Sequence, residues 1–183
     1  VITGAGQGIG EYLSINLSKK FFVFLISKSS NCEKISNQIN EKYPLSSDFL
    51  RIDFEKKINF KLLKKKIDLN SFKNINLIFC AGYLDNYSEE LDITEWKKVF
   101  NINVFSHLEI FNYFLPLMKK NKFNNKIIFF SGGGAANSFD TFPAYSASKT
   151  AIVRIVENLA LRYEKYNISI FAIAPGSIKT KML

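Results

Sequence analysis

Short apolar runs alternate with helix-like segments along the whole of this 183-residue chain. Six runs have the length and composition of buried strands, and they span residues 1–2, 22–26, 49–52, 75–79, 126–130 and 168–174. Strands that are apolar on both faces and joined by helices form parallel sheets with helices on either side. The predicted fold class is therefore α/β, a three-layer, doubly wound parallel sheet. Because no linker or repeat interrupts the pattern, residues 1–183 are predicted to form a single domain.

A glycine or polar cluster follows each predicted strand, and ligands of doubly wound sheets bind at these carboxyl ends. The first cluster, TGAGQGIG, stands between a strand and a helix. It does not fit G-x-G-x-x-G, because Ile9 occupies the place of the last glycine. It fits T-G-x-x-x-G-x-G through Thr3, Gly4, Gly8 and Gly10. Glycines let phosphate approach the backbone N–H groups at a helix N-terminus, so this loop indicates dinucleotide binding.

The end of the second strand reads Ser27, Lys28, Ser29. An acidic residue there would bind the ribose 2′-hydroxyl of NAD, whereas a basic residue tolerates the 2′-phosphate of NADP. The sequence has no carboxylate at these positions. NADP is therefore preferred over NAD, with Lys28 as the phosphate partner; the alternative is that Lys28 is an ordinary surface lysine.

Of the eight tyrosines, only Tyr145 has a lysine, Lys149, four positions later. Both fall in a predicted helix, where residues four apart lie on one face. The ammonium is expected to lower the pKa of the phenol from about 10. A tyrosine tuned in this way exchanges protons near neutral pH. By itself the spacing is equally typical of an exposed helix pair.

Composition limits the other functions. The net charge is +9, but the lysines are scattered, so no nucleic-acid partner is expected. No apolar run is long enough for a membrane span. Cys32 and Cys80 lack metal-ligand spacing and suit reduced packing residues of a cytoplasmic protein, with no metal site. The single histidine, His107, is predicted to be structural. Because Val1 rather than methionine begins the chain, it is expected to be a fragment truncated at both ends.

Taken together, the motifs resemble the short-chain dehydrogenase/reductase family over the whole chain. The four motifs that agree in identity and order are Thr3-Gly4-x3-Gly8-x-Gly10, Ala81-Gly82, Tyr145-x3-Lys149 and Pro175-Gly176 with Thr180. The resemblance implies a Rossmann-like, NAD(P)-binding fold and hydride transfer between the nicotinamide cofactor and the alcohol or ketone of a small molecule. It also implies a homodimer or homotetramer.

The resemblance assigns roles to individual residues. Tyr145 would be the general acid/base, and Lys149 would lower its pKa and bind the nicotinamide ribose. Asn103, in the long helix, would anchor a proton-relay water. The implied cofactor-binding residues are Thr3, Gly4, Gly8, Ile9, Gly10, Ser27, Lys28, Asp53, Phe54, Ala81, Gly82, Tyr145, Lys149, Pro175, Gly176, Ile178 and Thr180.

The sequence departs from the family pattern in two motifs. Phe79 and Cys80 stand where two asparagines are usual. Gly132 stands where the substrate-orienting serine is usual, thirteen residues before Tyr145. Ser131 is the predicted catalytic serine, brought into place by a one-residue adjustment of the glycine loop that follows it, with Ser138 as a weaker alternative. Two other functions stay open, a nucleotide-sugar epimerase or dehydratase and a non-catalytic dinucleotide-binding module.

Overall fold

The computed structural model describes residues 1–68, 71–86, 88–120, 123–176 and 178. Its strands lie in one sheet in the order β3-β2-β1-β4-β5-β6. Every strand pair with a described register is parallel. The strand order reverses at β1, which pairs with β2 on one side and β4 on the other, as in doubly wound folds. The predicted fold class is confirmed. The strands are β1 (Ile2–Thr3), β2 (Val23–Ser27), β3 (Ser47–Arg51), β4 (Leu77–Phe79), β5 (Asn125–Phe130) and β6 (Ile168–Ile173).

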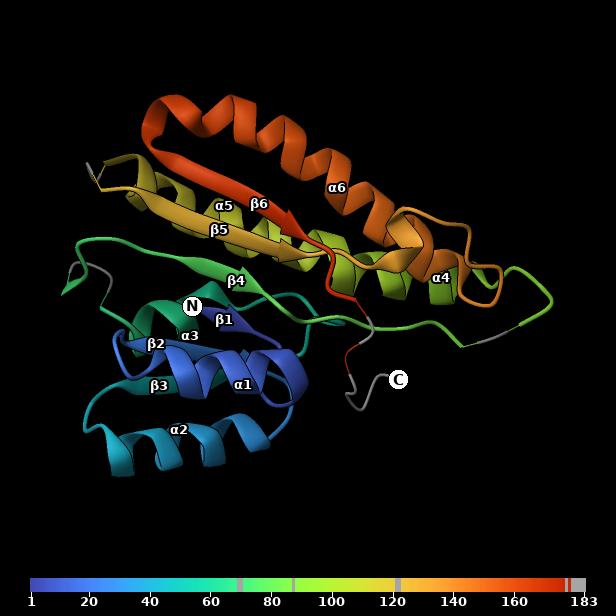
Figure 1. Ribbon diagram of the computed structural model, residues 1–183. Coiled ribbons are helices and arrows are strands. Elements are labelled where there is room, and N and C mark those ends of the chain that lie inside the picture. Colours follow the sequence, from blue (N-terminus) through green and yellow to red (C-terminus); the bar gives the residue numbers. More distant parts are fainter. Residues whose placement is uncertain (69–70, 87, 121–122, 177, 179–183) are drawn as a thin grey trace. The chain divides into compact units, whose positions relative to one another are not determined.

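Helical segments occupy the stretches between these strands (Figure 1). The α-helices are α1 (Gly8–Leu17), α2 (Asn31–Lys42), α3 (Phe60–Lys66), α4 (Ile93–Phe100), α5 (Ser106–Lys120) and α6 (Pro143–Tyr163). A π-helical turn, η2 (Asn101–Phe105), joins α4 to α5, and two 3-10 turns are η3 (Gly133–Ala135) and η4 (Glu164–Tyr166). The described residues include no helix long and apolar enough to cross a membrane.

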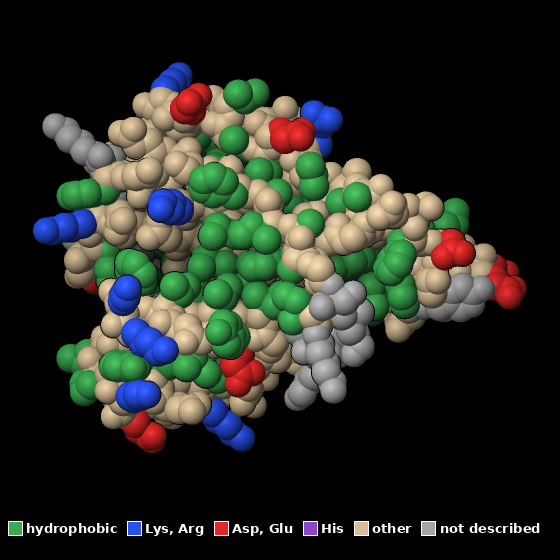
Figure 2. Space-filling model, viewed as in Figure 1, with side chains coloured by type: hydrophobic (Ala, Val, Ile, Leu, Met, Phe, Trp, Pro, Cys, Tyr) green, Lys and Arg blue, Asp and Glu red, His purple; other side chains and the backbone are tan. Residues whose placement is uncertain are grey.

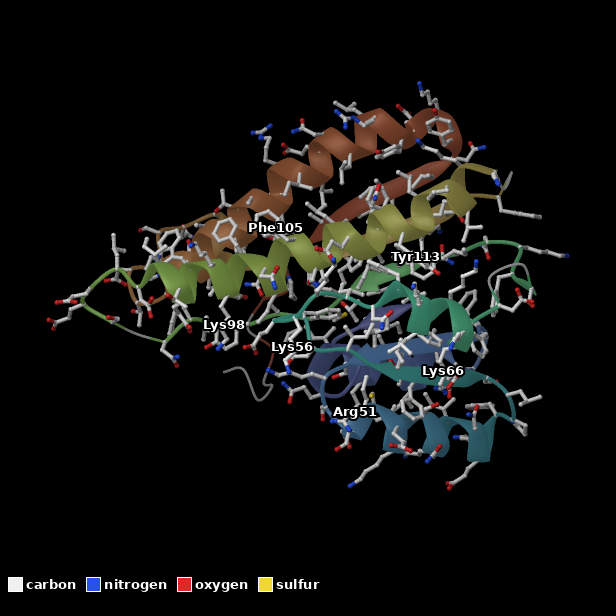
Figure 3. The ribbon with its side chains drawn as sticks, turned by 180° about the vertical axis from the view of Figure 1, so that it is seen from behind. Arg51, Lys56, Lys66, Lys98, Phe105 and Tyr113 are labelled. Carbon is white, nitrogen blue, oxygen red and sulfur yellow. The ribbon has the colours of Figure 1, made fainter. Side chains whose placement is uncertain are left out.

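The contacts of the chain cluster into two compact units, one formed by described residues of 1–72 and 78–81 and the other by those of 73–77 and 82–178. In the first unit, α1 and α2 lie on one face of the strands and α3 on the other (Figures 1 and 3). Its core consists of strand, turn and helix residues that are almost fully buried: Ile2, Ala5, Val23, Leu25, Cys32, Ile35 and Ile39.

In the second unit, helices α5 and α6 pack on β5 and β6. Phe129 of β5 is fully buried and meets the ring of His107 on α5, with the centroids 6.3 Å apart. Phe111 of α5 meets Tyr163 of α6 at 5.5 Å. The exposed residues of β6 include Phe171, at 49% exposure. Figure 2 shows hydrophobic side chains gathered on the face of the molecule that is turned toward the viewer in Figure 1, where β5 and β6 lie.

The start of α4 differs from an expectation based on residue type, which makes Thr94 the N-cap of the long helix. The observed N-cap is Asp92, whose carboxylate accepts hydrogen bonds from the backbone N–H of Thr94 (2.8 Å) and of Glu95 (3.3 Å). Both residue types cap helices well. Because Asp92 comes two positions earlier, its side chain reaches the first free N–H groups and Thr94 falls inside the first turn.

Candidate functional site

The glycine loop between β1 and α1 folds tightly against the end of β4. Gly4 has φ of +66°, and a Cβ there would lie 2.6 Å from the backbone N of Ala81. A Cβ on Gly10 would overlap the carbonyl oxygen of Gly4. The Thr3 hydroxyl accepts a hydrogen bond from Ala81 N–H at 3.2 Å. The first two predicted motifs therefore meet, and glycine is required where the backbones approach.

Helix α1 begins at this loop with its N–H groups available to an anion. Its N-cap, Gln7, makes no side-chain capping bond, and Gly8 has φ of +58°. Asn31 of α2 donates from Nδ2 to the Gly6 carbonyl at 2.7 Å and so fixes the loop against the end of β2. A ten-residue helix whose N-cap residue makes no side-chain capping bond is a suitable cradle for the pyrophosphate of a dinucleotide.

The end of β2 carries two cations rather than the single one predicted. Lys28 is exposed, and its Nζ lies 2.9 Å from Oε1 of Glu55. The Arg51 guanidinium donates to the Lys28 carbonyl at 3.3–3.4 Å, and Figure 3 shows Arg51 on the first unit. Arg51 is the register partner of Ser27 in the β2–β3 ladder, and Ser27 is 9% exposed with its Oγ accepting from Ser29 N–H at 3.2 Å. The sequence pattern for a phosphate partner concerns the end of β2, so it does not identify Arg51, which lies on the neighbouring strand β3.

The predicted cofactor-binding residues Asp53 and Phe54 follow β3. The Asp53 carboxylate accepts from the backbone N–H of Glu55 at 3.1 Å, and Phe54 is buried at 6% exposure. These contacts form a turn at the carboxyl end of the strand. Asp53 is therefore held by its own turn rather than exposed on an open loop.

The predicted cofactor-binding residues that follow β4 and β6 are less buried than Phe54. Gly82 and Pro175 are half-buried, whereas Gly176 and Ile178 are exposed. Thr180 lies outside the described residues. Ile9, in the first turn of α1, is half-buried.

Tyr145 and Lys149 stand one turn apart on α6, as predicted. Lys149 is 4% exposed, donates from Nζ to the Phe130 carbonyl at 2.9 Å, and has its Nζ 5.4 Å from the centroid of the Tyr145 ring. Burial raises the pKa of the Tyr145 phenol above its usual value, opposite to the predicted lowering. The physical cause is desolvation, because this half-buried position disfavours the charged phenolate relative to the neutral phenol.

Asn103 lies in the π-helical turn and joins three segments of the second unit. It is fully buried, its Oδ1 accepts from Tyr83 N–H at 2.7 Å, and its Nδ2 donates to Tyr83 O at 3.0 Å. The same Nδ2 donates to the Ser148 hydroxyl at 2.9 Å, and that hydroxyl donates to the Tyr145 carbonyl at 2.7 Å. Single π-turns within α-helices are frequent at functional sites. Here the turn places an amide between the loop after β4 and the helix that bears Tyr145.

The predicted adjustment that would turn Ser131 toward the substrate is not observed. Ser131 is 4% exposed, and its hydroxyl donates to the Lys149 carbonyl at 3.0 Å. A Cβ on Gly132 would lie 3.2 Å from the Tyr145 hydroxyl. Position 132 therefore faces the phenol but carries no hydroxyl, and Ser131 stabilises the helix turn that carries Lys149.

Asp85, which the sequence patterns did not single out, caps the helix that bears Tyr145. Its carboxylate accepts from Ala144 N–H and from Tyr145 N–H, both at 3.1 Å, and the residue is 6% exposed. No local signal identifies it, because it lies about sixty residues before the helix it caps.

His107 is structural, as predicted. It is 2% exposed, and burial lowers the pKa of its imidazole to about 3, with the nearby charge of Lys149 acting in the same direction and a hydrogen bond from the imidazole to the backbone of Asn103 opposing it. A histidine that stays neutral throughout the physiological range is not a proton carrier at pH 7.

A parallel sheet whose order reverses at β1, a glycine loop there and a tyrosine–lysine turn on α6 define a nicotinamide-dependent oxidoreductase. The chain belongs to the short-chain dehydrogenase family, whose model, described as short chain dehydrogenase, matches residues 1–183.

Individual relatives agree with this membership. An oxidoreductase of Schizosaccharomyces pombe is 32% identical over 186 residues, covering 100% of this chain and 71% of that protein. The (S)-benzoin-forming benzil reductase of Saccharomyces cerevisiae is 25% identical, covering 100% of this chain and 72% of that protein. A solved short-chain dehydrogenase/reductase of Saccharomyces cerevisiae has a TM-score of 0.81 at 27% identity, covering 99% of this chain and 71% of that chain.

A short-chain dehydrogenase of Shigella flexneri, solved in complex with NADP, shares the fold with a TM-score of 0.88 at 24% identity, covering 99% of this chain and 78% of that chain. The predicted family, the enzyme class and NAD(P)-dependent hydride transfer are confirmed. The alternatives of an epimerase or dehydratase and of a non-catalytic module are not favoured.

Proposed function

We propose that Tyr145 is the general acid/base of an NAD(P)-dependent reaction that interconverts the alcohol and ketone of a small molecule. The observation that carries this is the environment of Tyr145. Its N–H donates to Asp85, its carbonyl accepts from the Ser148 hydroxyl, and Lys149 lies one turn away with its ammonium 5.4 Å from the ring centroid. When bound, the cofactor supplies or accepts a hydride at the carbinol carbon. In the reducing direction the Tyr145 hydroxyl gives its proton to the substrate oxygen; in the oxidising direction it takes that proton back.

Lys149, Asn103 and Ser131 complete the proposed catalytic group. The Lys149 ammonium, which is buried, stabilises negative charge on the phenolate when Tyr145 has lost its proton. The Asn103 side chain orients the turn that carries Tyr145 through Ser148, and this residue is proposed to anchor a relay water. The Ser131 hydroxyl donates to the backbone carbonyl of Lys149 and so stabilises that helix turn. A substrate-orienting role would require the Ser131 hydroxyl to turn away from this carbonyl.

For the cofactor we infer that NADP is preferred. The residues that would hold it are the glycine loop with the N-terminus of α1 at the pyrophosphate, and Lys28 at the 2′-phosphate. Arg51 adds a second cation beside Lys28. A carboxylate that would bind the 2′-hydroxyl of NAD is missing from 27–29, but Glu55, paired with Lys28, is close enough to compete for that lysine.

The substrate is proposed to be a small carbonyl compound, and benzil is the first probe because the Saccharomyces cerevisiae relative is named for reducing it. Further proposals are that the two compact units act as one dinucleotide-binding domain, that the protein is cytoplasmic, and that it forms a homodimer or homotetramer.

The proposed function is tested by titrating the protein with NADPH and with NADH while following reduced-nicotinamide fluorescence, and then by following NADPH oxidation at 340 nm with benzil. Tighter binding of NADPH and benzil-dependent oxidation are expected. Equal or tighter binding of NADH would overturn the NADP preference alone. Binding of neither nucleotide would overturn the assigned cofactor residues.

A further inference from the structure

The helix that carries Tyr145 takes its N-terminal cap from a distant residue. Phe142, at the N-cap position of α6, makes no side-chain capping bond, and Pro143 is the first helical residue. The next two N–H groups, of Ala144 and Tyr145, both donate to the carboxylate of Asp85 at 3.1 Å. A carboxylate at a helix N-terminus is favoured both by these charge-assisted bonds and by the helix dipole.

The local candidates for this cap are used elsewhere. Asp140 and Thr141 stand just before the helix and are residue types that commonly cap helices. The Asp140 carboxylate instead accepts from the Thr141 N–H at 2.8 Å and from the Thr141 hydroxyl at 3.3 Å. The start of α6 therefore depends on the loop that follows β4.

The same loop is bound to the other side of Tyr145. The Tyr83 N–H and carbonyl are both bound by Asn103, which donates to Ser148, and Ser148 donates to the Tyr145 carbonyl. Asp85 receives the Tyr145 N–H. The hydrogen bonds thus run from residue 83 through the π-turn to the carbonyl of Tyr145, and from residue 85 directly to its N–H.

We propose that Asp85 is a positioning residue for the reaction: it fixes the first turn of α6 and thereby the direction of the Tyr145 phenol. This rests on the function proposed above. Asp85 is 6% exposed, so its two bonds are made away from bulk water. Their loss would leave two N–H groups without an acceptor at the turn that bears the proton donor. Loss of orientation at a reacting group lowers the rate of the chemical step more than it weakens substrate binding.

The chain offers a matched control. Asp92 caps α4 in the same unit, also through two backbone N–H groups, but its helix turn does not carry Tyr145. Asp85→Ala and Asp92→Ala each remove a carboxylate cap that accepts from two backbone N–H groups; the Asp85 cap is buried and the Asp92 cap is exposed. Asp85→Asn leaves one acceptor oxygen at the Asp85 position and serves as the conservative variant.

The experiment measures kcat and KM for benzil, the Kd for NADPH and the melting temperature of these variants. For Asp85→Ala we expect kcat to fall at least tenfold while KM and the NADPH Kd change less than threefold. Asp92→Ala should melt at a lower temperature than the wild type but keep kcat within twofold, and Asp85→Asn should recover part of kcat. Equal kcat values for the two alanine variants, or a loss confined to KM, would overturn the positioning role.

Hydrogen exchange of the peptide containing 143–149 separates this proposal from the proposed function. Asp85→Ala should exchange the amides of Ala144 and Tyr145 at least ten times faster, whereas Asp92→Ala should leave them unchanged. If the wild type does not oxidise NADPH with benzil but this exchange increases, the function with benzil fails and the positioning of Tyr145 by Asp85 stands. Unchanged exchange in both Asp85→Ala and Asp85→Asn overturns the positioning of Tyr145 by Asp85, whatever the activity. If Asp85→Ala does not fold, Asp85→Asn alone decides, and unchanged exchange in that variant overturns the proposal.

Discussion

The two compact units arrange their candidate functional residues in different ways. The first uses mainly backbone: the glycine loop and the free N–H groups of α1 come from one continuous stretch, 3–10, which meets Ala81 through Thr3. The second uses side chains from separate segments, with Asp85, Asn103 and Ser131 arranged around the Tyr145–Lys149 turn. Phosphate is bound by a local backbone conformation, whereas proton transfer requires a side chain whose direction is fixed by distant hydrogen bonds.

Replacing Tyr145 by phenylalanine is the largest expected change and affects only the second unit. The ring and its packing stay, but the proton donor is removed, so kcat for benzil should fall by about 10²–10⁴-fold. The NADPH Kd should stay within threefold of the wild type. Stopped-flow or steady-state assays at 340 nm check this, with Tyr113→Phe as the control that removes a hydroxyl from α5. Retained turnover in Tyr145→Phe would mean that another group supplies the proton.

Replacing Gly4 by alanine tests the backbone character of the first unit. With φ of +66° and a Cβ that would lie 2.6 Å from Ala81 N, the variant should lose at least about 2 kcal/mol of unfolding free energy. NADPH binding should weaken more than tenfold because the loop must shift. Gly133→Ala is the control, since a Cβ there has no atom within 4 Å. Urea unfolding and fluorescence titration measure both effects; equal behaviour of the two variants would contradict the tight-loop interpretation.

His107 predicts an acid sensitivity that belongs to the second unit. The pKa of its imidazole is about 3 in the folded protein against 6.5 when unfolded. Below pH 6.5 the imidazole binds a proton in the unfolded chain but stays neutral in the folded protein. The free energy of unfolding is therefore unaffected by this group above pH 6.5 and decreases as the pH falls toward 3. At pH 5 the loss is about 2 kcal/mol. Unfolding of wild type and His107→Gln, measured from pH 7.5 to pH 5, should show a steeper decline in the wild type; parallel curves would refute the buried neutral imidazole.

Reversing the charge of Lys28 tests how the first unit selects its cofactor. Lys28→Asp should weaken NADPH binding by roughly tenfold, about 1.4 kcal/mol, and leave NADH binding within twofold. Lys66→Asp is the matched control, because Lys66 is also an exposed lysine of the first unit in an ion pair, with Asp48 at 3.1 Å (Figure 3). If Lys28→Asp and Lys66→Asp weaken NADPH binding equally, the loss comes from the change in net charge and not from a specific contact of Lys28.

Ser131 and Gly132 give the smallest expected effects. Ser131→Ala removes the bond to the Lys149 carbonyl and should cost about 1 kcal/mol of stability, with kcat reduced less than tenfold. Adding Gly132→Ser to it puts a hydroxyl opposite the Tyr145 phenol and should restore or raise kcat. A fall of a hundredfold or more in Ser131→Ala alone would instead return the substrate-orienting role to Ser131.

Most of the fold followed from the sequence because strand periodicity and glycine punctuation are local. Residues 22–26 and 126–130 were identified as strands since they are short, continuously apolar and followed by polar clusters, and the structure has β2 and β5 there. The glycine loop was identified for the same reason: its conformation depends on which positions lack a Cβ. The helix start near Thr94 was misplaced by two residues, because residue type does not say which of two good caps reaches the free N–H groups.

The sequence by itself determined the parallel α/β fold, the dinucleotide loop and the pairing of Tyr145 with Lys149 on one helix, all of which depend on spacing along the chain. Only the tertiary structure decided that Asp85 caps α6, that Arg51 lies beside Lys28 and that the Ser131 hydroxyl turns to Lys149. It also decided the sign of the pKa shift of Tyr145, because burial is set by everything that packs around the phenol. Hydrogen-bond partners sixty residues apart and the extent of desolvation have no signature in local sequence; they arise only when the segments meet.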